Sequence, residues 1–201
     1  MADLSVLSPQ DHEAVLKEII LGSRNFTHAT GGHDRPKAVI LAGQPGAGKG
    51  SLTAAAKAEL HGDVTVIDPD ALRYAHPKLD ELHGKYPYTW ADHTHPDASQ
   101  WAKELRAEAI AQRKNLIIDG TMPKAEVIRE LKAQGYDVEV RAVAAHRFES
   151  ELGVDKRFAD GIDTDTHGRY VPAHIRKDVY EALPKALDDV ARETGVPIRI
   201  Y

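Results

Sequence analysis

The sequence predicts an α/β domain in which a mostly parallel β-sheet lies between two layers of helices. From Lys37 onward, short apolar segments alternate with stretches of helical periodicity, as they do in βαβ units. The first apolar segment runs into a glycine-rich turn and a helix, and acidic residues directly follow the next two. The length of 201 residues and the ordinary composition, with 42% hydrophobic and 28% charged residues, fit one domain of this kind.

A first helix is expected before this core. It begins at Ser8-Pro9, because Pro at the first helical position gives up no N–H group that the helix needs. The apolar residues that follow at helical spacing are Val15, Leu16, Ile19 and Ile20. The glycine-bearing stretch 22–35 is expected to be a loop. We therefore expect residues 1–36 to form a helix and connector packed on the core, and residues 37–201 to form the core, in a single structural domain overall.

The core elements follow from the apolar pattern and its interruptions. The predicted strands are residues 37–41, 64–67, 116–118, 138–143 and 198–200. The predicted helices are residues 49–60, 98–113, 124–134, 148–158 and 173–193.

Charge and cysteine content narrow the function classes. The formal net charge of −5 and the lack of a long Lys/Arg run argue against nucleic acid or an anionic membrane as the main partner. The chain has no cysteine, which excludes disulfides and thiolate zinc sites. Its first residues do not resemble an export signal, and its longest apolar runs, such as 38–42, are too short to span a bilayer. We therefore expect a cytoplasmic protein that binds neither nucleic acid nor membranes.

The strongest local signal is the glycine-rich segment after the first predicted strand. The residues that we expect to contact a nucleotide are Gly43, Gln44, Pro45, Gly46, Ala47, Gly48, Lys49, Gly50 and Ser51. Glycines let backbone N–H groups close around an anion, the helix N-terminus adds partial positive charge, and Lys49 can reach the β- and γ-phosphates. This is the phosphate-binding P-loop, and it predicts the three-layer P-loop NTPase/kinase fold. The alternative is a glycine-rich turn that only joins a strand to a helix.

The P-loop departs from the usual pattern at one position. Gly50 stands where a Ser or Thr usually ligates Mg²⁺, and the hydroxyl of Ser51 comes one place later. Adenylate-kinase-like enzymes also carry Gly-Lys-Gly here. We therefore expect Mg²⁺ to be bound through water, with Ser51 and Asp119 as the candidate metal-binding residues.

Acidic residues follow the second and third predicted strands directly. Because ligands bind beyond the carboxyl ends of parallel strands, Asp70 and Asp119 are expected to face one crevice with the P-loop. One carboxylate could accept the proton of an attacking hydroxyl and another could hold Mg²⁺. The plainer alternatives are that Asp70 caps a helix starting at Ala71 and that Asp119 opens a turn. Asp68 is expected to be structural, since side-chain alternation near a strand end turns it away from the site.

A charged segment after the fourth predicted strand has the properties of a mobile lid. Phosphoryl transfer needs positive charge over the phosphates and a way to exclude water. Residues 155–171 suit this role within a lid of about 153–172, and Arg157 and Arg169 are the expected phosphate contacts. The alternative is a solvated surface loop.

The eleven histidines could suggest a metal site, above all His93 and His95, with His76 and His83 before them. None shows the i, i+4 spacing of a helical zinc site, and no cysteine is present. We expect them to be surface or substrate-pocket residues.

In combination these segments resemble the zeta toxin family, kinases of bacterial toxin–antitoxin systems that phosphorylate UDP-N-acetylglucosamine. The segments that carry the resemblance are 43–49, 66–70, 75–82, 115–121, 150–157 and 169–172. Their order and spacing together are far more specific than the P-loop alone. The resemblance implies ATP and Mg²⁺ as cofactors and in-line transfer of the γ-phosphoryl to the 3′-hydroxyl of the sugar.

The resemblance also assigns roles to the catalytic candidates. Lys49 would bind the ATP phosphates, and Asp70 would activate the sugar hydroxyl as general base and contact the substrate. Arg157 and Arg169 would hold the transferring phosphoryl group.

Three further positions would hold the sugar nucleotide or the metal, namely Asp119, Thr121 and Glu104. Asp119 falls where the family usually has Glu, and the placement of Glu104 requires a gap in the alignment. A further departure is that the segment 122–134 is shortened where the family contacts its substrate. Together with Gly50, these departures weaken the inferred substrate more than the inferred kinase activity.

The resemblance implies a toxin that depletes a cell-wall precursor and a small helical antitoxin that obstructs its nucleotide site. One alternative is a kinase of another nucleotide sugar or small metabolite, such as a nucleoside monophosphate, which the Gly-Lys-Gly sequence favours slightly. The other is a nucleotide-binding regulator without transfer activity.

Overall fold

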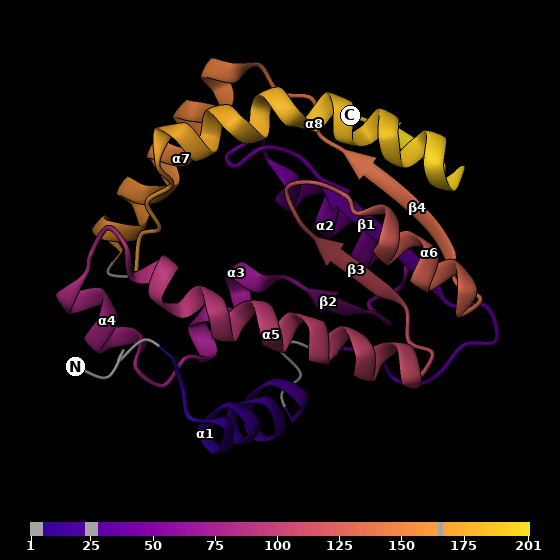
Figure 1. The fold of residues 1–201 in the computed structure, drawn as a ribbon, viewed down its shortest axis with the longest axis horizontal. Helices are drawn as coiled ribbons and strands as arrows, with labels where there is room; N and C mark the ends of the chain where they lie inside the picture. The colour runs from indigo at the N-terminus through magenta and orange to yellow at the C-terminus, as the bar shows by residue number, and fades with distance from the viewer. Residues whose placement is uncertain (1–5, 23–27, 165–166) are drawn as a thin grey trace.

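A five-stranded parallel sheet forms the centre of the computed structural model, which describes residues 6–22, 28–164 and 167–201 (Figure 1). The strand order is β2-β3-β1-β4-β5, and each neighbouring pair is parallel. The strands are β1 (Lys37–Ala42), β2 (Thr65–Ile67), β3 (Leu116–Asp119), β4 (Asp137–Ala142) and β5 (Ile198–Ile200). Each lies within one residue of its predicted bounds, and the predicted α/β class is confirmed.

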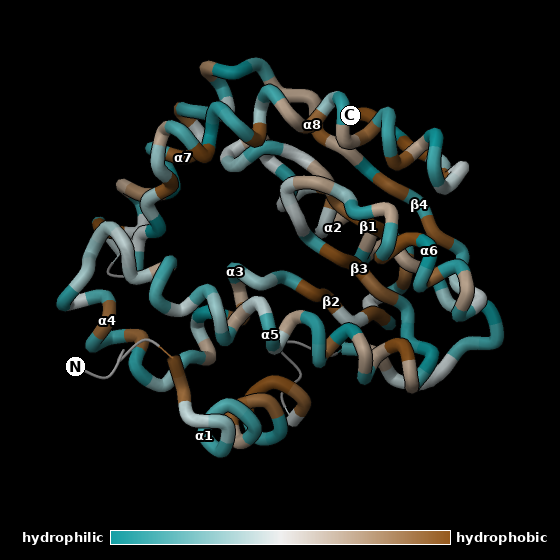
Figure 2. The backbone as a smooth tube through the Cα atoms, viewed as in Figure 1, coloured by the Kyte–Doolittle hydropathy of each residue, from teal (hydrophilic) through white to brown (hydrophobic). Residues whose placement is uncertain are grey.

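Side-chain alternation along the strands builds a core on each face of the sheet. In β1, Ala38, Ile40 and Ala42 belong to the larger hydrophobic cluster, whereas Val39 and Leu41 belong to the other. Figure 2 shows hydrophobic stretches along β2, β3 and β4. Buried on both faces, these strands therefore require helices on both sides.

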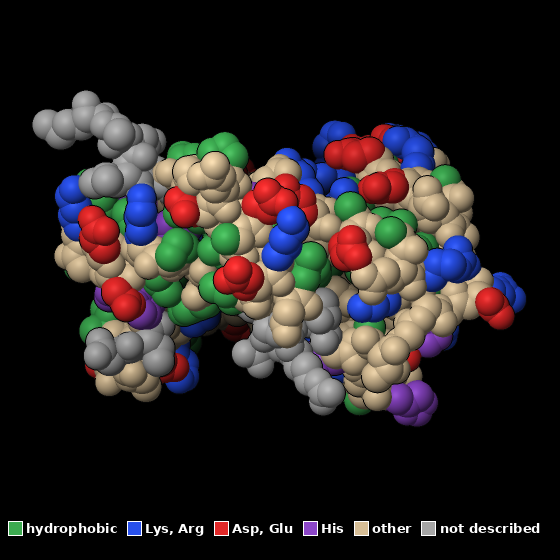
Figure 3. Space-filling model, turned by 90° about the horizontal axis from the view of Figure 1, so that it is seen from below, with side chains coloured by type: hydrophobic (Ala, Val, Ile, Leu, Met, Phe, Trp, Pro, Cys, Tyr) green, Lys and Arg blue, Asp and Glu red, His purple; other side chains and the backbone are tan. Residues whose placement is uncertain are grey.

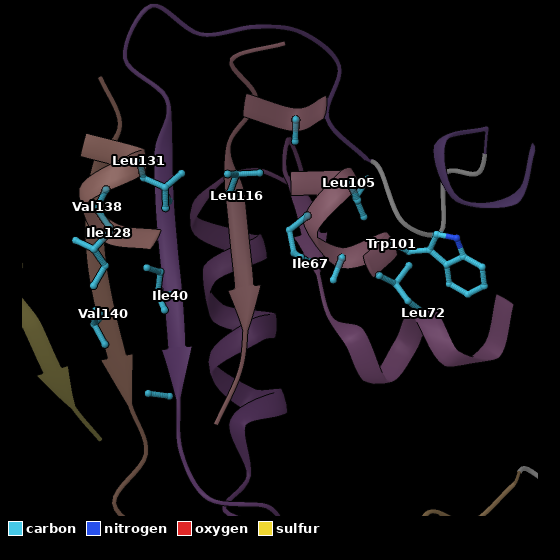
Figure 4. Packing of buried hydrophobic residues seen from close by; sticks show 14 of the residues in the cluster. Ile40, Ile67, Leu72, Trp101, Leu105, Leu116, Ile128, Leu131, Val138 and Val140 are labelled. Atoms are coloured by element: carbon cyan, nitrogen blue, oxygen red, sulfur yellow. The ribbon is translucent and has the colours of Figure 1, made fainter. Parts of the chain in front are cut away.

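The helices form the two outer layers. The larger cluster takes residues from α5 (Trp90–Ala111), α6 (Ala125–Ala133) and α8 (Ala173–Thr194), and the smaller takes Leu52 and Ala56 from α2 (Lys49–Glu59). Figure 4 shows members of the larger cluster from β1, β2, β3 and β4 beside Trp101 and Leu105 of α5 and Ile128 and Leu131 of α6. The result is the predicted three-layer arrangement.

The N-terminal segment begins with a capped helix, as the sequence predicts. The Ser8 hydroxyl accepts a hydrogen bond from the Asp11 N–H group, and α1 (Pro9–Ala14) continues into the π-helix η1 (Val15–Leu21). Trp101 of α5 donates its indole N–H to the His12 carbonyl at 3.1 Å, so the segment lies against α5. The predicted connector falls partly on residues outside the described ranges, and residues 28–35 form neither helix nor strand.

The segment between β2 and β3 holds elements that the pattern does not predict. They are α3 (Pro69–Leu72), the 3₁₀ helix η2 (Arg73–Ala75) and α4 (Leu79–Lys85). In addition, α5 begins at Trp90, eight residues before its predicted start, and it continues through Pro96. Burial of Trp90 and Trp101, each at most 1% exposed, offsets the helix-breaking effect of Pro96.

The predicted lid is helical over much of its length. Helix α7 (Arg147–Asp163) extends five residues beyond its predicted end, and it includes residues 155–163 of the predicted mobile segment. Residues 165–166 lie outside the described ranges, and 167–172 form neither helix nor strand.

Surface charge is mixed. In Figure 3, acidic and basic side chains are interspersed over the face seen from the α1 side. Within the described ranges, no helix is both long enough and apolar enough to cross a membrane.

Candidate active site

The P-loop joins β1 to α2 at the carboxyl edge of the sheet. Helix α2 begins at Lys49, after Gly48 in the left-handed backbone region with φ +87°, and Gly46 has φ +82°. Glycine is the residue that adopts these conformations without strain. A Cβ atom added at Gly48 or Gly50 would meet no atom within 4 Å, so the backbone is open where a phosphate would sit. This cradle fits the phosphates of a nucleotide.

Helix α7 lies directly on the P-loop and holds it. The Ser150 hydroxyl donates to the Pro45 carbonyl at 2.6 Å, and a Cβ atom at Gly153 would lie 2.4 Å from the Gly46 carbonyl oxygen. The buried side-chain amide of Gln44, in the P-loop, donates a hydrogen bond at 2.8 Å to the carbonyl of Ala145, which lies in the loop before α7. The P-loop is thus fixed by contacts from residues more than one hundred positions away.

Lys49 faces a cavity of about 420 Å³, which we name the central cavity. Its ammonium group donates to the Gly43 carbonyl at 3.1 Å. Burial lowers the pKa of Lys49, and the charges of Asp119 and Asp70 oppose this shift. The predicted site residues that line the central cavity are Pro45, Lys49, Asp70, Asp119, Thr121, Arg157 and Arg169. Segments far apart in the sequence therefore meet here.

The two aspartates after β2 divide the structural and chemical roles. Asp68, not Asp70, caps α3, since its carboxylate accepts the Asp70 N–H group at 2.8 Å. The alternative in which Asp70 is the cap is therefore wrong, and so is the expectation that Asp68 turns away, because its side chain lines the central cavity. Burial, followed by the charge of Asp70, raises the pKa of Asp68.

The Asp70 carboxylate lies between two arginines. One oxygen accepts from Arg169, and the other accepts from Arg73 Nε at 3.2 Å. Burial alone would raise the pKa of Asp70, but the charges of Arg169 and Arg73 outweigh it and lower the pKa. Asp70 is thus an ionised carboxylate at neutral pH, able to accept a proton from a group in the cavity.

Arg73 is a site residue that the sequence analysis missed. Only 4% exposed, it also donates to the Ala91 carbonyl and lies 2.9 Å from His95 Nδ1. Its i, i+3 spacing from Asp70 was the available signal, since residues so spaced share a helix face. Arg73 connects the candidate base to the start of α5.

Asp119 ends β3 at the same edge. Burial raises its pKa to about 6, with the charge of Lys49 opposing the shift and the charges of Asp68 and Asp70 adding to it. The neighbouring Thr121 accepts the Gly43 N–H group with its carbonyl at 3.0 Å, which holds the β3 loop beside the P-loop.

The two lid arginines face two cavities at once. Arg157 and Arg169 line both the central cavity and a cavity of about 590 Å³ beside Tyr74 and Trp90. The buried Nε of Arg169 has no hydrogen-bond partner among the described residues. A buried donor without an acceptor at the edge of a phosphate cradle fits a bound anion.

Glu104 is not brought to this site. Its carboxylate faces the N-terminal helix, 3.1 Å from His12 Nε2, and accepts from Gln100 at 2.8 Å. One position earlier on α5, about 100° around the helix, Lys103 lines a cavity next to the site. The expected substrate role of Glu104 does not fit this placement.

The residues fit Mg²⁺ only in company with a nucleotide. The described residues contain no group of three or more His, Cys, Asp or Glu side chains that could hold a metal ion. The Ser51 hydroxyl donates to the Gly48 carbonyl at 2.9 Å, in the first turn of α2. Mg²⁺ is commonly held by one or two carboxylates together with phosphates and water, a role for which Asp119 is placed.

Comparison with known proteins gives a consistent result. The zeta toxin family model matches residues 23–201. Toxin zeta of Streptococcus pyogenes is 31% identical over 193 residues, covering 92% of this chain and 64% of the relative. Toxin zeta of Enterococcus hirae is 30% identical over 193 residues, covering 92% of this chain and 65% of the relative.

Solved structures show the same fold. A chain from the PezAT chromosomal toxin–antitoxin system of Streptococcus pneumoniae superposes with a TM-score of 0.78 at 23% identity, covering all of this chain and 79% of that chain. A chain of the AvrRxo1-ORF1:AvrRxo1-ORF2 complex gives a TM-score of 0.64 at 16% identity, and the match covers 95% of this chain and 62% of that chain. In the comparison with the two zeta toxins above, this chain spans slightly less than two thirds of the length of each relative. On the match of the family model over most of its length, the chain belongs to the zeta toxin family.

Proposed function

We propose that the protein is an ATP-dependent kinase that transfers the γ-phosphoryl group of ATP to a sugar hydroxyl of UDP-N-acetylglucosamine. The single observation that carries the kinase activity is the central cavity. It brings Lys49, Asp70, Arg157 and Arg169 from four separate segments around one space beside an open P-loop. A P-loop alone would serve any nucleotide-binding protein, whereas the added carboxylate and arginines match the needs of phosphoryl transfer.

Each side chain has a defined part in this reaction. Asp70 accepts the proton of the attacking hydroxyl, and Arg73 keeps its carboxylate in place. Lys49 and Arg157 neutralise the charge on the phosphates. Arg169, bound to Asp70 in this structure, lines the same cavity and would hold the transferring phosphoryl group. Positioning and charge neutralisation supply the catalysis, so no covalent intermediate with the protein is needed.

Mg²⁺ would reach the site with the nucleotide. When bound, it would add positive charge at the β- and γ-phosphates. Asp119 is the candidate to hold it, directly or through water, and Ser51 remains a second candidate.

The acceptor and the biological role rest on the family. Family membership supports UDP-N-acetylglucosamine as the acceptor, interference with cell-wall precursor synthesis as the effect, and the cytoplasm as the place of action. The PezAT system is by its name a toxin–antitoxin system, which supports an antitoxin partner for this chain. We propose that such a partner acts by covering the nucleotide site.

Mass spectrometry of products tests the proposal. Purified protein with ATP, Mg²⁺ and UDP-N-acetylglucosamine should yield ADP and a sugar nucleotide heavier by one phosphoryl group. A panel of nucleoside monophosphates and other nucleotide sugars should give much less product. ATP binding without any phosphorylated acceptor would contradict the proposed activity and favour a nucleotide-binding regulator.

A further inference from the structure

Residues 167–169, which follow the lid helix α7 and end in Arg169, contact other elements at every position. We name them the arginine segment. Figure 1 shows α7 ending beside the connection from α4 to α5, where the rings of Phe158 and Tyr88 lie 5.8 Å apart. The guanidinium group of Arg169 binds the Asp70 carboxylate. Whatever fixes the arginine segment therefore also fixes Arg169 relative to the candidate base.

The first contact of the arginine segment is made by the ring of His167. Its Nε2 atom lies 2.9 Å from a carboxylate oxygen of Asp80, in the first turn of α4. The ring also makes edge contacts at centroid distances of 4.6, 6.2 and 6.4 Å, with His83, Trp90 and Tyr74 respectively. The Asp80 side chain is 93% exposed, so solvent screens this ion pair and it holds the segment only loosely.

The second contact is made by the buried backbone of Gly168. Its carbonyl oxygen accepts the indole N–H of Trp90 at 3.1 Å. On the other side α7 leaves no space, because a Cβ atom at Gly161 would lie 2.4 Å from the Gly168 Cα atom. One added at Gly168 would lie 2.5 Å from the Phe158 carbonyl oxygen. The Gly168 peptide is thus held between Trp90 of α5 and the backbone of α7.

The hydrogen bond from Trp90 is costly to lose. A buried carbonyl without a donor keeps the full penalty of its desolvation, so the Gly168 peptide would have to move toward water. Because Arg169 is the next residue, this movement would shift its guanidinium group relative to Asp70. Trp90 is only 1% exposed and offers a substrate almost no surface. Its influence on the site therefore passes through the arginine segment.

We propose that Trp90 is a positioning residue of the active site, whose indole N–H fixes Arg169 against Asp70 through the Gly168 carbonyl. This inference rests on the proposed kinase function and adds to it a residue that orders the arginine for phosphoryl transfer. A guanidinium group that is in place before the transition state forms stabilises it without a cost of reorganisation. The arginine segment supplies this order from outside the substrate contacts.

Trp90→Phe removes the donor and keeps an aromatic ring in the core. Single-turnover transfer from ATP to UDP-N-acetylglucosamine should slow about tenfold or more, as expected for one buried hydrogen bond left unmade. The Kd of ATP should stay within about twofold, because the P-loop and Lys49 are unchanged. The matched control is Trp101→Phe, since Trp101 lies on the same helix, is fully buried and donates its indole N–H at 3.1 Å to the His12 carbonyl. The control should transfer at the wild-type rate.

A second measurement does not depend on turnover. Burial raises the pKa of Asp70, and the charge of Arg169 is the largest influence that lowers it. Trp90→Phe should therefore raise the pKa of Asp70, although Arg73 and Arg157 still lower it. The control variant should leave it unchanged. NMR titration of ¹³C-labelled aspartate carboxylates measures this pKa, with the Asp70 signal assigned from the Asp70→Asn variant.

Gly161→Ala displaces the arginine segment from the opposite side and leaves Trp90 in place. Alanine is favoured in a helix interior, so α7 itself is not weakened, while the new Cβ atom meets the backbone of Gly168. We expect a raised pKa of Asp70 and slower transfer here as well. In an Arg169→Ala background, Trp90→Phe should slow transfer no further, because it acts through that arginine.

An unchanged pKa of Asp70 in a folded Trp90→Phe variant would overturn the inference, and if that variant does not fold, an unchanged pKa in Gly161→Ala would do the same. Wild-type transfer by Trp90→Phe, or an equal loss of transfer in the Trp101→Phe control, would also overturn it. A further loss in the Arg169→Ala background would show that Trp90 acts by another route. If the wild type transfers no phosphoryl group but the pKa of Asp70 rises in Trp90→Phe alone, the positioning stands and only the kinase function is contradicted.

Discussion

The contact between Gly46 and Gly153 allows a sharp prediction about how α7 positions the P-loop. In an exposed helix interior, Gly→Ala usually stabilises by about 0.5–1 kcal/mol. At position 153 the added Cβ atom would lie 2.4 Å from the Gly46 carbonyl oxygen and 3.2 Å from its carbonyl carbon. These are backbone atoms of the P-loop, so they cannot turn aside as a side chain could.

Relief of this clash requires α7 and the P-loop to separate. An ordinary contact begins near 3.4 Å, so Gly153→Ala must move them apart by about 1 Å. Overpacking of this kind costs about 1–3 kcal/mol, which exceeds the helix gain. A shift of that size also misplaces the backbone N–H groups of the phosphate cradle, and the loss of one hydrogen bond to a charged phosphate weakens binding about tenfold or more.

Urea denaturation and ATP titration of Gly153→Ala measure both effects. Gly84→Ala is the matched control, because a Cβ atom at that position in α4 meets nothing within 4 Å. We expect the control to be slightly stabilised with unchanged ATP affinity, and Gly153→Ala to lose both stability and affinity. Wild-type affinity for ATP in a fully stable Gly153→Ala variant would refute the reasoning.

Three other substitutions test the remaining parts of the site and its support. Arg73→Met removes a buried donor from Asp70 and from the Ala91 carbonyl, so urea denaturation should show a loss of about 2–3 kcal/mol, and a loss under about 0.5 kcal/mol would contradict the positioning role. Asp119→Asn should stabilise the fold more at pH 8 than at pH 4.5, by about 2 kcal/mol. A pKa raised from 3.8 to about 6 means that the folded protein loses stability as pH rises through this window, and the amide has no such loss. A stability difference between variant and wild type that does not change with pH would refute the assignment. His12→Ala removes the ring that bridges Asp97 at 2.6 Å and Glu104, so amide hydrogen exchange in α1 should become faster and stability should fall by about 1.5–3 kcal/mol; unchanged exchange would show that the bridge does not hold the segment.

Much of the fold is encoded in local pattern. The five strands are short, apolar and bounded by turn residues, so each was predicted within one residue. The P-loop and the carboxylates after β2 and β3 could be placed at one edge because parallel strands align their carboxyl ends. The capped helix at Ser8 follows from cap chemistry alone.

The parts that the pattern missed depend on tertiary contacts. Helix α5 continues through Pro96 because Trp90 and Trp101 are buried, which no local propensity encodes. Asp68 rather than Asp70 caps α3. Either aspartate could serve as the N-cap as far as the sequence shows, because the choice depends on the residue at which the helix begins. Glu104 was assigned to the substrate on an alignment that requires a gap, and its carboxylate lies 3.1 Å from His12 Nε2 on the N-terminal helix.

The rate of phosphoryl transfer by Asp70→Asn, measured in single turnover beside its affinity for ATP, tests the central claim most directly. Circular dichroism would first establish that the variant is folded, because Arg73 and Arg169 lose their carboxylate partner. The account predicts that ATP still binds, while transfer to UDP-N-acetylglucosamine falls by about 10²–10⁴-fold. Transfer at the wild-type rate by a folded, ATP-binding Asp70→Asn variant would contradict it.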